Sequence, residues 1–236
     1  MKKILGILGG MGPQATADLL QKIIGLTAAN SDQEHIHIYI DNYPQIPERI
    51  SAILKGSVSP APALQEGLDR LAALGAQCIV MPCVTAHYFL PQLRMPQQIQ
   101  FINMLQTAAE AGVARYGKQR AALLATPATL RSDLLAKAME KAGANYLLPL
   151  DREREELGEL IYAVKSGEPL MDIVKRFNVM LEAMVGRGAH YFVLGCTELP
   201  LIAAQATVAP YHFVDPTIEL AKAAVLACGY TLKSRD

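Results

Sequence analysis

The sequence has no net charge of either sign and no long apolar run. Lysine plus arginine and aspartate plus glutamate number 22 each, so there is no basic field of the kind that attracts nucleic acid. Hydrophobic residues make up 51% of the chain, yet no apolar run approaches the roughly 18 residues that would span a bilayer. We therefore expect a soluble protein with heavily buried strands and without nucleic-acid or membrane partners.

A signal peptide is not expected either. Two lysines precede a short apolar run, but a glycine-rich turn interrupts the run at Gly9, too early for a secretory leader. The expected location is the cytoplasm, where thiols stay reduced. We therefore expect the four cysteines to be free, namely Cys78, Cys83, Cys196 and Cys228.

Two of these cysteines lie in matching surroundings. Gly75 and Gly188 each open a segment made of a Gly-Ala turn, a short apolar run and a cysteine, and a threonine follows within two residues. The two glycines are 113 positions apart, as are Cys83 and Cys196. Short apolar runs between turns are typical of buried strands. The sequence therefore predicts that one structural unit occurs twice.

The rest of the chain alternates between strand and helix patterns. The strands are expected at 3–8, 35–41, 120–125, 146–150 and 191–194, and the helices at 14–28, 62–74, 130–142, 155–164 and 173–185. Asp18 and Asp133, each followed by two leucines, are expected at equivalent places in the first helix of each half.

This alternation is typical of parallel sheets with helices on both faces. We expect an α/β protein with two similar lobes, at 1–112 and 113–214. Each lobe would contain a parallel sheet of the four-stranded type. A pseudo-twofold axis would relate the lobes, and the active site would lie in the cleft between them.

Two thiols at matching strand ends suit a reaction that moves a proton between the two faces of a carbon atom. The pKa of an unassisted cysteine is about 8.5, and a place at a helix N-terminus lowers it. A helix is expected after Cys83 and after Cys196, where N–H groups and the threonine could stabilise an enolate-like oxygen. The pattern indicates a racemase or epimerase. The alternative for any cysteine is a buried apolar role, which we expect for Cys78 and Cys228.

Four motifs resemble the cofactor-independent aspartate/glutamate racemase family, most of all its aspartate racemase branch. They are Gly-Gly-Met-Gly-Pro-Gln-Ala-Thr from Gly9, Ile-Pro-Glu-Arg ending at Arg49, Pro-Cys-Val-Thr-Ala-His around Cys83 and Gly-Cys-Thr-Glu around Cys196. The resemblance implies racemisation without pyridoxal phosphate or another cofactor, a small acidic amino acid as substrate, and a homodimer. It also implies that a C-terminal helix at about 215–236 packs on the N-terminal lobe.

The resemblance assigns roles to single residues. Cys83 and Cys196 match the catalytic thiols, and the threonines that follow them match those that bind the substrate's α-carboxylate. Arg49 and Lys165 match a basic pair for the side-chain carboxylate, and two cations do favour an acidic side chain over an apolar one. The candidates for substrate contact are Arg49, Lys165, Thr85, Thr197, Val84, Met11, Thr126 and Glu198.

One position departs from the family pattern. Val84 stands where the family usually has an asparagine, and a valine can neither donate nor accept a hydrogen bond. A lost polar contact costs roughly 1 to 3 kcal/mol. Two alternatives therefore stay open: a related dicarboxylate isomerase or decarboxylase, and a non-catalytic protein that binds an acidic metabolite.

Neither a metal nor a nucleotide is expected. His35 and His37 alternate on an expected strand, but no further metal ligands lie at a helpful spacing. The turn at Gly9 lacks the Gly-x-Gly-x-x-Gly order of dinucleotide sites, and its expected use is close backbone approach to a small ligand. His87 and Glu198 follow the two thiol motifs, and a proton-relay role and a structural role both fit them.

Overall fold

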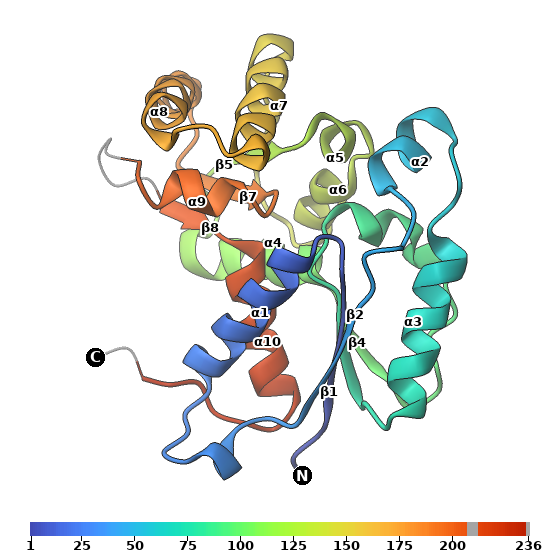
Figure 1. Cartoon of the computed structure of the whole chain (residues 1–236). Coiled ribbons are helices and arrows are strands. Elements are labelled where there is room, and N and C mark those ends of the chain that lie inside the picture. Colours follow the sequence, from blue (N-terminus) through green and yellow to red (C-terminus); the bar gives the residue numbers. More distant parts are fainter. Residues whose placement is uncertain (207–211, 235–236) are drawn as a thin grey trace. The chain divides into compact units, whose positions relative to one another are not determined.

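The computed structural model describes residues 1–206 and 212–234, and the chain divides into two compact units (Figure 1). One unit contains Met1–Thr107 together with Thr217–Asp236, and the other contains Ala108–Pro216. Each unit has one four-stranded parallel sheet, which confirms the predicted fold class. The chain passes from the first unit to the second inside α4 (Met104–Tyr116), the helix that also contains the boundary expected at 112/113.

The sheet of the first unit has the strand order β2-β1-β3-β4. The inner strand β1 (Leu5–Gly9) is buried along its whole length, as expected for a strand covered on both faces. The other strands are β2 (Ile38–Asn42), β3 (Cys78–Val80) and β4 (Gln100–Ile102). The helices are α1 (Pro13–Leu26), α2 (Arg49–Lys55), α3 (Ala61–Ala73) and α10 (Pro216–Ala227), with the 3-10 helices η1 (Asp32–Glu34) and η2 (Thr85–Gln92).

The second unit repeats this topology with the order β6-β5-β7-β8. β5 (Ala121–Ala125) takes the place of β1, and β7 (Tyr191–Gly195) takes that of β3. The edge strands are β6 (Tyr146–Leu147) and β8 (His212–Val214), and the helices are α5 (Pro127–Arg131), α6 (Leu134–Lys141), α7 (Asp151–Ser166), α8 (Leu170–Gly186) and α9 (Leu199–Ala203). Cys83 follows β3 and Cys196 follows β7, so the two thiols occupy corresponding places in the two sheets.

Some local predictions are wrong. The helix expected at 130–142 is two helices, α5 and α6, separated at Asp133, whose φ of 54° is left-handed. Asp133 therefore stands before a helix, whereas Asp18 lies within α1, and the two are not equivalent. β2 begins at Ile38, so His35 and His37 precede the strand and do not share one of its faces.

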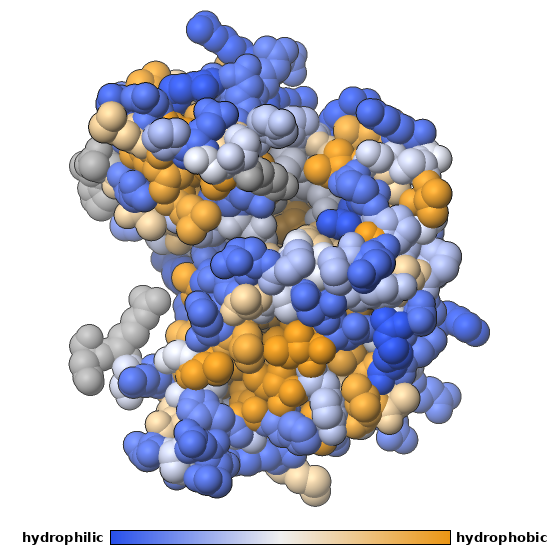
Figure 2. Space-filling model, viewed as in Figure 1, coloured by the Kyte–Doolittle hydropathy of each residue, from blue (hydrophilic) through white to orange (hydrophobic). Residues whose placement is uncertain are grey.

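The C-terminal segment packs on the first unit. The N–H of Lys3 donates to the carbonyl of Cys228 (2.9 Å), and the backbone after α10 pairs with the end of α1 through Lys233 N to Leu26 O (2.8 Å). Figure 2 shows apolar side chains gathered on the surface over α1 and α10, where Ile24 and Leu226 are exposed. The segment that follows α10 is thus held by backbone bonds to the residues before β1 and to the end of α1.

The turn after β1 lies close to the backbone of the loop that follows β2. Thr16 on α1 accepts a hydrogen bond from the N–H of Gly10 (2.9 Å), and its hydroxyl donates to the carbonyl of Gly12 (3.2 Å). Gly10 has a φ of 88°, and a Cβ at this position would overlap the backbone of Tyr43. A glycine is therefore required for the turn to lie against the loop after β2, and this turn carries Met11.

We predict that Gly10→Ala destabilises the protein far more than Gly56→Ala. Both glycines have positive φ values, 88° and 63°, but a Cβ on Gly56 would meet nothing within 4 Å. The control should lose about 1 kcal/mol from backbone strain, and Gly10→Ala should lose more than about 3 kcal/mol because it adds an overlap with backbone. Urea unfolding measures both losses. Equal losses would contradict the close approach to Tyr43.

Candidate active site

Met11 and the first thiol motif lie at the carboxyl ends of β1 and β3, which are neighbours in the sheet. Met11 follows β1, and Cys83 follows β3 after a Met-Pro pair. Met11, Ile46 and Cys83 belong to one cluster of packed, buried side chains. Ligands of open α/β sheets bind at this edge. The structure thus brings Met11 and the first thiol motif together where a ligand is expected.

Cys83 is only 5% exposed and is held by its neighbours. Its N–H donates to the carbonyl of Met81 (2.9 Å), and its Sγ lies 3.5 Å from the Oγ1 of Thr85. A hydroxyl in this place can donate to a thiolate. Val84 lies between these two residues in the sequence and is 6% exposed, so a buried apolar side chain accompanies the thiol.

His87 is a buried, neutral imidazole. Its Nδ1 lies 2.8 Å from the carbonyl oxygen of Cys83, and the N–H of Met104 donates to its Nε2 (3.2 Å). Because a carbonyl only accepts and a backbone N–H only donates, Nδ1 carries the proton and Nε2 the lone pair. Burial lowers the pKa of His87 to about 4, against the opposing effect of the bond to Cys83. Both nitrogens are occupied, so the structural role fits His87 and the relay role does not.

Arg49 begins α2 and has a buried donor without a partner. Its Nη1 donates to the carbonyls of Ile46 and Pro47 (both 3.2 Å), whereas its Nε makes no hydrogen bond to any described residue. The neighbouring Glu48 caps α2 by accepting from the N–H groups of two following residues. Burial raises the pKa of Glu48, but these bonds outweigh burial and hold the pKa below its usual value. A guanidinium with a spare donor suits a carboxylate ligand.

In the second unit the candidate residues lie at the carboxyl ends of β5 and β7, which pair up to Ala125 and Gly195. Thr126 follows β5, and its hydroxyl caps α5 by accepting from the N–H of Thr129 (3.2 Å). Cys196 follows β7 and is 9% exposed. The two candidates lie at neighbouring strand ends, as Met11 and Cys83 do in the first unit.

The polar partner of Cys196 differs from that of Cys83. The Sγ of Cys196 donates to the Oε2 of Glu198 (2.8 Å), and the hydroxyl of Thr197 donates to the same oxygen (3.2 Å). A carboxylate acceptor favours the protonated thiol, since it binds the S–H proton and repels a thiolate. The sequence placed Glu198 among the substrate contacts, and in the structure its carboxylate contacts the thiol and the threonine.

Lys165 lies in the last turn of α7, but its side chain is outside the part of the chain that the structure describes. Among the described residues, no three His, Cys, Asp or Glu side chains form a group that could hold a metal ion. Within the same residues, every helix is too short or too polar to cross a membrane.

Comparison with known proteins identifies the family. The chain matches the family described as Asp/Glu/Hydantoin racemase over residues 8–224. The chain belongs to this racemase family. Its structure is similar to that of the Picrophilus torridus aspartate racemase, with a TM-score of 0.81 and 29% sequence identity, over 98% of this chain and 96% of that chain.

Two sequence relatives are also racemases. The broad specificity amino-acid racemase RacX of Bacillus subtilis strain 168 is 22% identical over 200 residues, which are 83% of this chain and 86% of that protein. A glutamate racemase of Deinococcus radiodurans is 33% identical over 139 residues, which are 57% of this chain and 46% of that protein. The resemblance of the four motifs to this family is confirmed. The names of the relatives do not agree on one substrate, since one gives aspartate, one gives glutamate and RacX is named for broad specificity.

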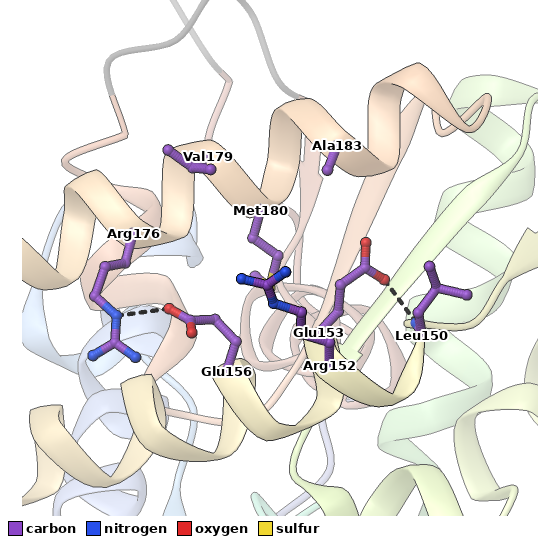
Figure 3. Close-up of a pocket in the computed structure, with 8 residues that line it drawn as sticks. All are labelled: Leu150, Arg152, Glu153, Glu156, Arg176, Val179, Met180 and Ala183. Atoms are coloured by element: carbon purple, nitrogen blue, oxygen red, sulfur yellow. Dashed lines mark hydrogen bonds and ion pairs between the residues drawn. The ribbon is translucent and has the colours of Figure 1, made fainter.

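A cavity of about 570 Å³ lies between α7 and α8 of the racemase, within the second unit (Figure 3). The glutamates that line it form ion pairs, Glu156 with Arg176 and Glu153 with Arg187. Its apolar wall is formed by Leu150, Val179, Met180 and Ala183. None of the candidate residues lines this cavity, so we do not assign the substrate to it.

We predict that the stability of this racemase falls between pH 6.5 and 4 because of His87. Its folded-state pKa of about 4 lies below the ordinary 6.5, so within this window the unfolded chain binds a proton that the folded chain does not. The stabilisation is complete above pH 6.5, is lost as the pH falls towards 4, and amounts to about 3 kcal/mol. Urea unfolding at several pH values measures it.

Two variants separate the contribution of His87 to the pH dependence of stability from the contributions of other titrating groups. His87→Leu should remove this part of the pH dependence, whereas His37→Leu, at an exposed position, should keep it. The same pH dependence in His87→Leu and in the unaltered protein would show that the His87 imidazole is not held neutral by the fold.

Proposed function

We propose that this protein is a cofactor-independent amino-acid racemase that acts on aspartate, with Cys83 and Cys196 as its two acid/base groups. The observation that carries the proposal is the matching place of the thiols, each after the inner strand that neighbours the first strand of its sheet. Two such units facing each other would present the thiols to opposite faces of the substrate's α-carbon. Membership of the racemase family supports this chemistry.

In the proposed reaction the Cys83 thiolate removes the α-proton, and the Cys196 thiol delivers a proton to the opposite face. Two contacts are compatible with these roles, since the Oγ1 of Thr85 lies 3.5 Å from the Sγ of Cys83 and Glu198 accepts the S–H proton of Cys196. The α C–H bond of the substrate and the S–H bond of Cys196 break, and an S–H bond at Cys83 and a new α C–H bond form. After the transfer Cys83 is a thiol and Cys196 a thiolate, which is the state that starts the reverse reaction.

Removal of the α-proton places negative charge on the substrate's α-carboxylate. Hydroxyl and N–H donors that face this group stabilise the enolate-like intermediate more than the substrate, which lowers the barrier. We propose that Thr85 and Thr197 supply such donors, as the family resemblance implies. Thr197 would then exchange its hydrogen bond to Glu198 for one to the substrate.

Aspartate is the proposed substrate because of Arg49. Its positive charge and its buried Nε, which makes no hydrogen bond to any described residue, suit a second carboxylate. We propose that Lys165 joins it, on the family resemblance alone. The name of the Picrophilus relative supports aspartate, and the name of the Deinococcus relative keeps glutamate as the nearest alternative.

A second candidate function is the binding of an acidic metabolite without turnover. Val84 favours it, because a buried apolar side chain stands beside the thiol where the family pattern has an amide. The presence of both thiols favours catalysis instead. It also counts against a related dicarboxylate isomerase or decarboxylase, since such chemistry can proceed with a single thiol.

We predict that Cys83→Ala and Cys196→Ala each lower the racemisation rate by about 10²- to 10⁴-fold. Each variant should still exchange the α-proton of one enantiomer only, and the two variants should act on opposite enantiomers. Proton NMR of D- and L-aspartate in heavy water follows both reactions. Cys78→Ala, which also removes a buried thiol, is the matched control and should retain racemisation. Full activity in either active-site variant would exclude the two-base mechanism.

We predict that Val84→Asn raises kcat/KM for aspartate by about tenfold, because an amide regains a polar contact of roughly 1 to 3 kcal/mol. Initial rates with L-aspartate measure the change, and rates with L-glutamate show whether it is specific. Val84→Leu keeps the site apolar and serves as the control. An unchanged rate in Val84→Asn would mean that no substrate group faces this position.

A further inference from the structure

We infer that His87 is a positioning residue for Cys83, acting as a neutral imidazole that ties the Cys83 carbonyl to the start of α4. The inference deepens the proposed function, because it rests on Cys83 being one of the two acid/base groups. It assigns His87 a task in catalysis that requires no change in its own protonation.

The imidazole joins two elements that are distant in the sequence. Its Nδ1–H donates to the carbonyl of Cys83, the residue two before η2, and its Nε2 accepts from the N–H of Met104, the first residue of α4. The ring is 3% exposed, and the ring centroid of Phe101 lies 5.9 Å away. The orientation of the imidazole is therefore fixed by two hydrogen bonds and by packing.

These bonds hold the backbone on both sides of the thiol. The N–H of Cys83 donates to Met81, and its carbonyl accepts from His87, so neither peptide next to the residue can rotate freely. Removal of the imidazole would leave the Cys83 carbonyl and the Met104 N–H without these partners. A buried polar group without a partner costs about 1 to 3 kcal/mol, so the peptide would shift to find another one.

A shift of this peptide moves the Sγ of Cys83 with it. A displacement of about 1 Å in an acid/base group can lower the rate about 10²-fold, because proton transfer requires close alignment with the C–H bond. The binding of substrate by Arg49 depends on a different loop and should change little. Loss of the His87 imidazole should therefore lower kcat and leave KM nearly unchanged.

The carbonyl of Cys196 is held differently, because it accepts from the backbone N–H of Leu199 (3.2 Å). His87 is four residues after Cys83, and the residue four after Cys196 is Pro200, which has no side-chain donor. The polar partner of Cys196 is instead the carboxylate of Glu198. Loss of the imidazole should therefore affect one thiol and leave the other unchanged, which provides an internal control.

The test places His87→Leu in each single-thiol background. With Cys196→Ala, where exchange depends on Cys83, the α-proton exchange of aspartate in heavy water should fall at least tenfold in kcat with KM within threefold. With Cys83→Ala, exchange of the other enantiomer should stay within twofold. His87→Asn, which retains a donor near the place of Nδ1, should recover part of the loss. Equal losses in both backgrounds, or no loss in either, would overturn the inference.

A second measurement needs no substrate and so separates this inference from the proposed function. Methyl methanethiosulfonate modifies Cys83 and Cys196, which are similarly buried, and peptide mass spectrometry gives the rate at each thiol. His87→Leu should change the rate at Cys83 at least fivefold and leave that at Cys196 within twofold. If no amino acid exchanges but this selectivity is seen, racemisation fails and the positioning of Cys83 stands. Equal changes at both thiols would overturn it.

Discussion

The arrangement of both thiols depends on one constraint, the burial of the inner strands of each parallel sheet. β1, β3, β5 and β7 are buried at every residue, so polar groups that act on a ligand come from the loops that follow these strands. In a parallel sheet the carboxyl ends of neighbouring strands lie at one edge, which places two such loops side by side. Met11 and Cys83 share this edge in the first unit, and Thr126 and Cys196 share it in the second.

The duplicated fold carries two thiols whose local chemistry has diverged. In the first unit a hydroxyl lies near the thiol, and a neutral histidine holds its backbone. In the second unit a carboxylate accepts the thiol proton. A symmetric pair in identical surroundings would share one proton between two equivalent sites. The two thiols have different partners, so the proposed mechanism lacks this symmetry, although racemisation in both directions would use each thiol as acid and as base.

The sequence predicts the strands and the thiol positions well, because continuous apolar runs between turns leave little choice of structure. It predicts short or locally irregular elements poorly. β4 has three residues, one of them exposed, and the left-handed residue Asp133 interrupts a run that keeps helical spacing throughout. The candidate residues could be named from their motifs, but their partners could not. The N–H of Met104 donates to His87 from 17 residues away, and the guanidinium of Arg49 donates to backbone carbonyls through Nη1 while its Nε has no described partner.

The charges at the two edges support a direction for the proton transfer. In the first unit His87 is held neutral, Val84 is apolar and Glu48 caps α2, while the Nε of Arg49 makes no hydrogen bond to any described residue. In the second unit the carboxylate of Glu198 lies against the sulfur. A thiolate is favoured by nearby positive charge and opposed by nearby negative charge. In the proposed mechanism this contrast favours proton removal by Cys83 and proton delivery by Cys196, and Arg49, the proposed contact of the substrate's second carboxylate, belongs to the same unit as the proposed base.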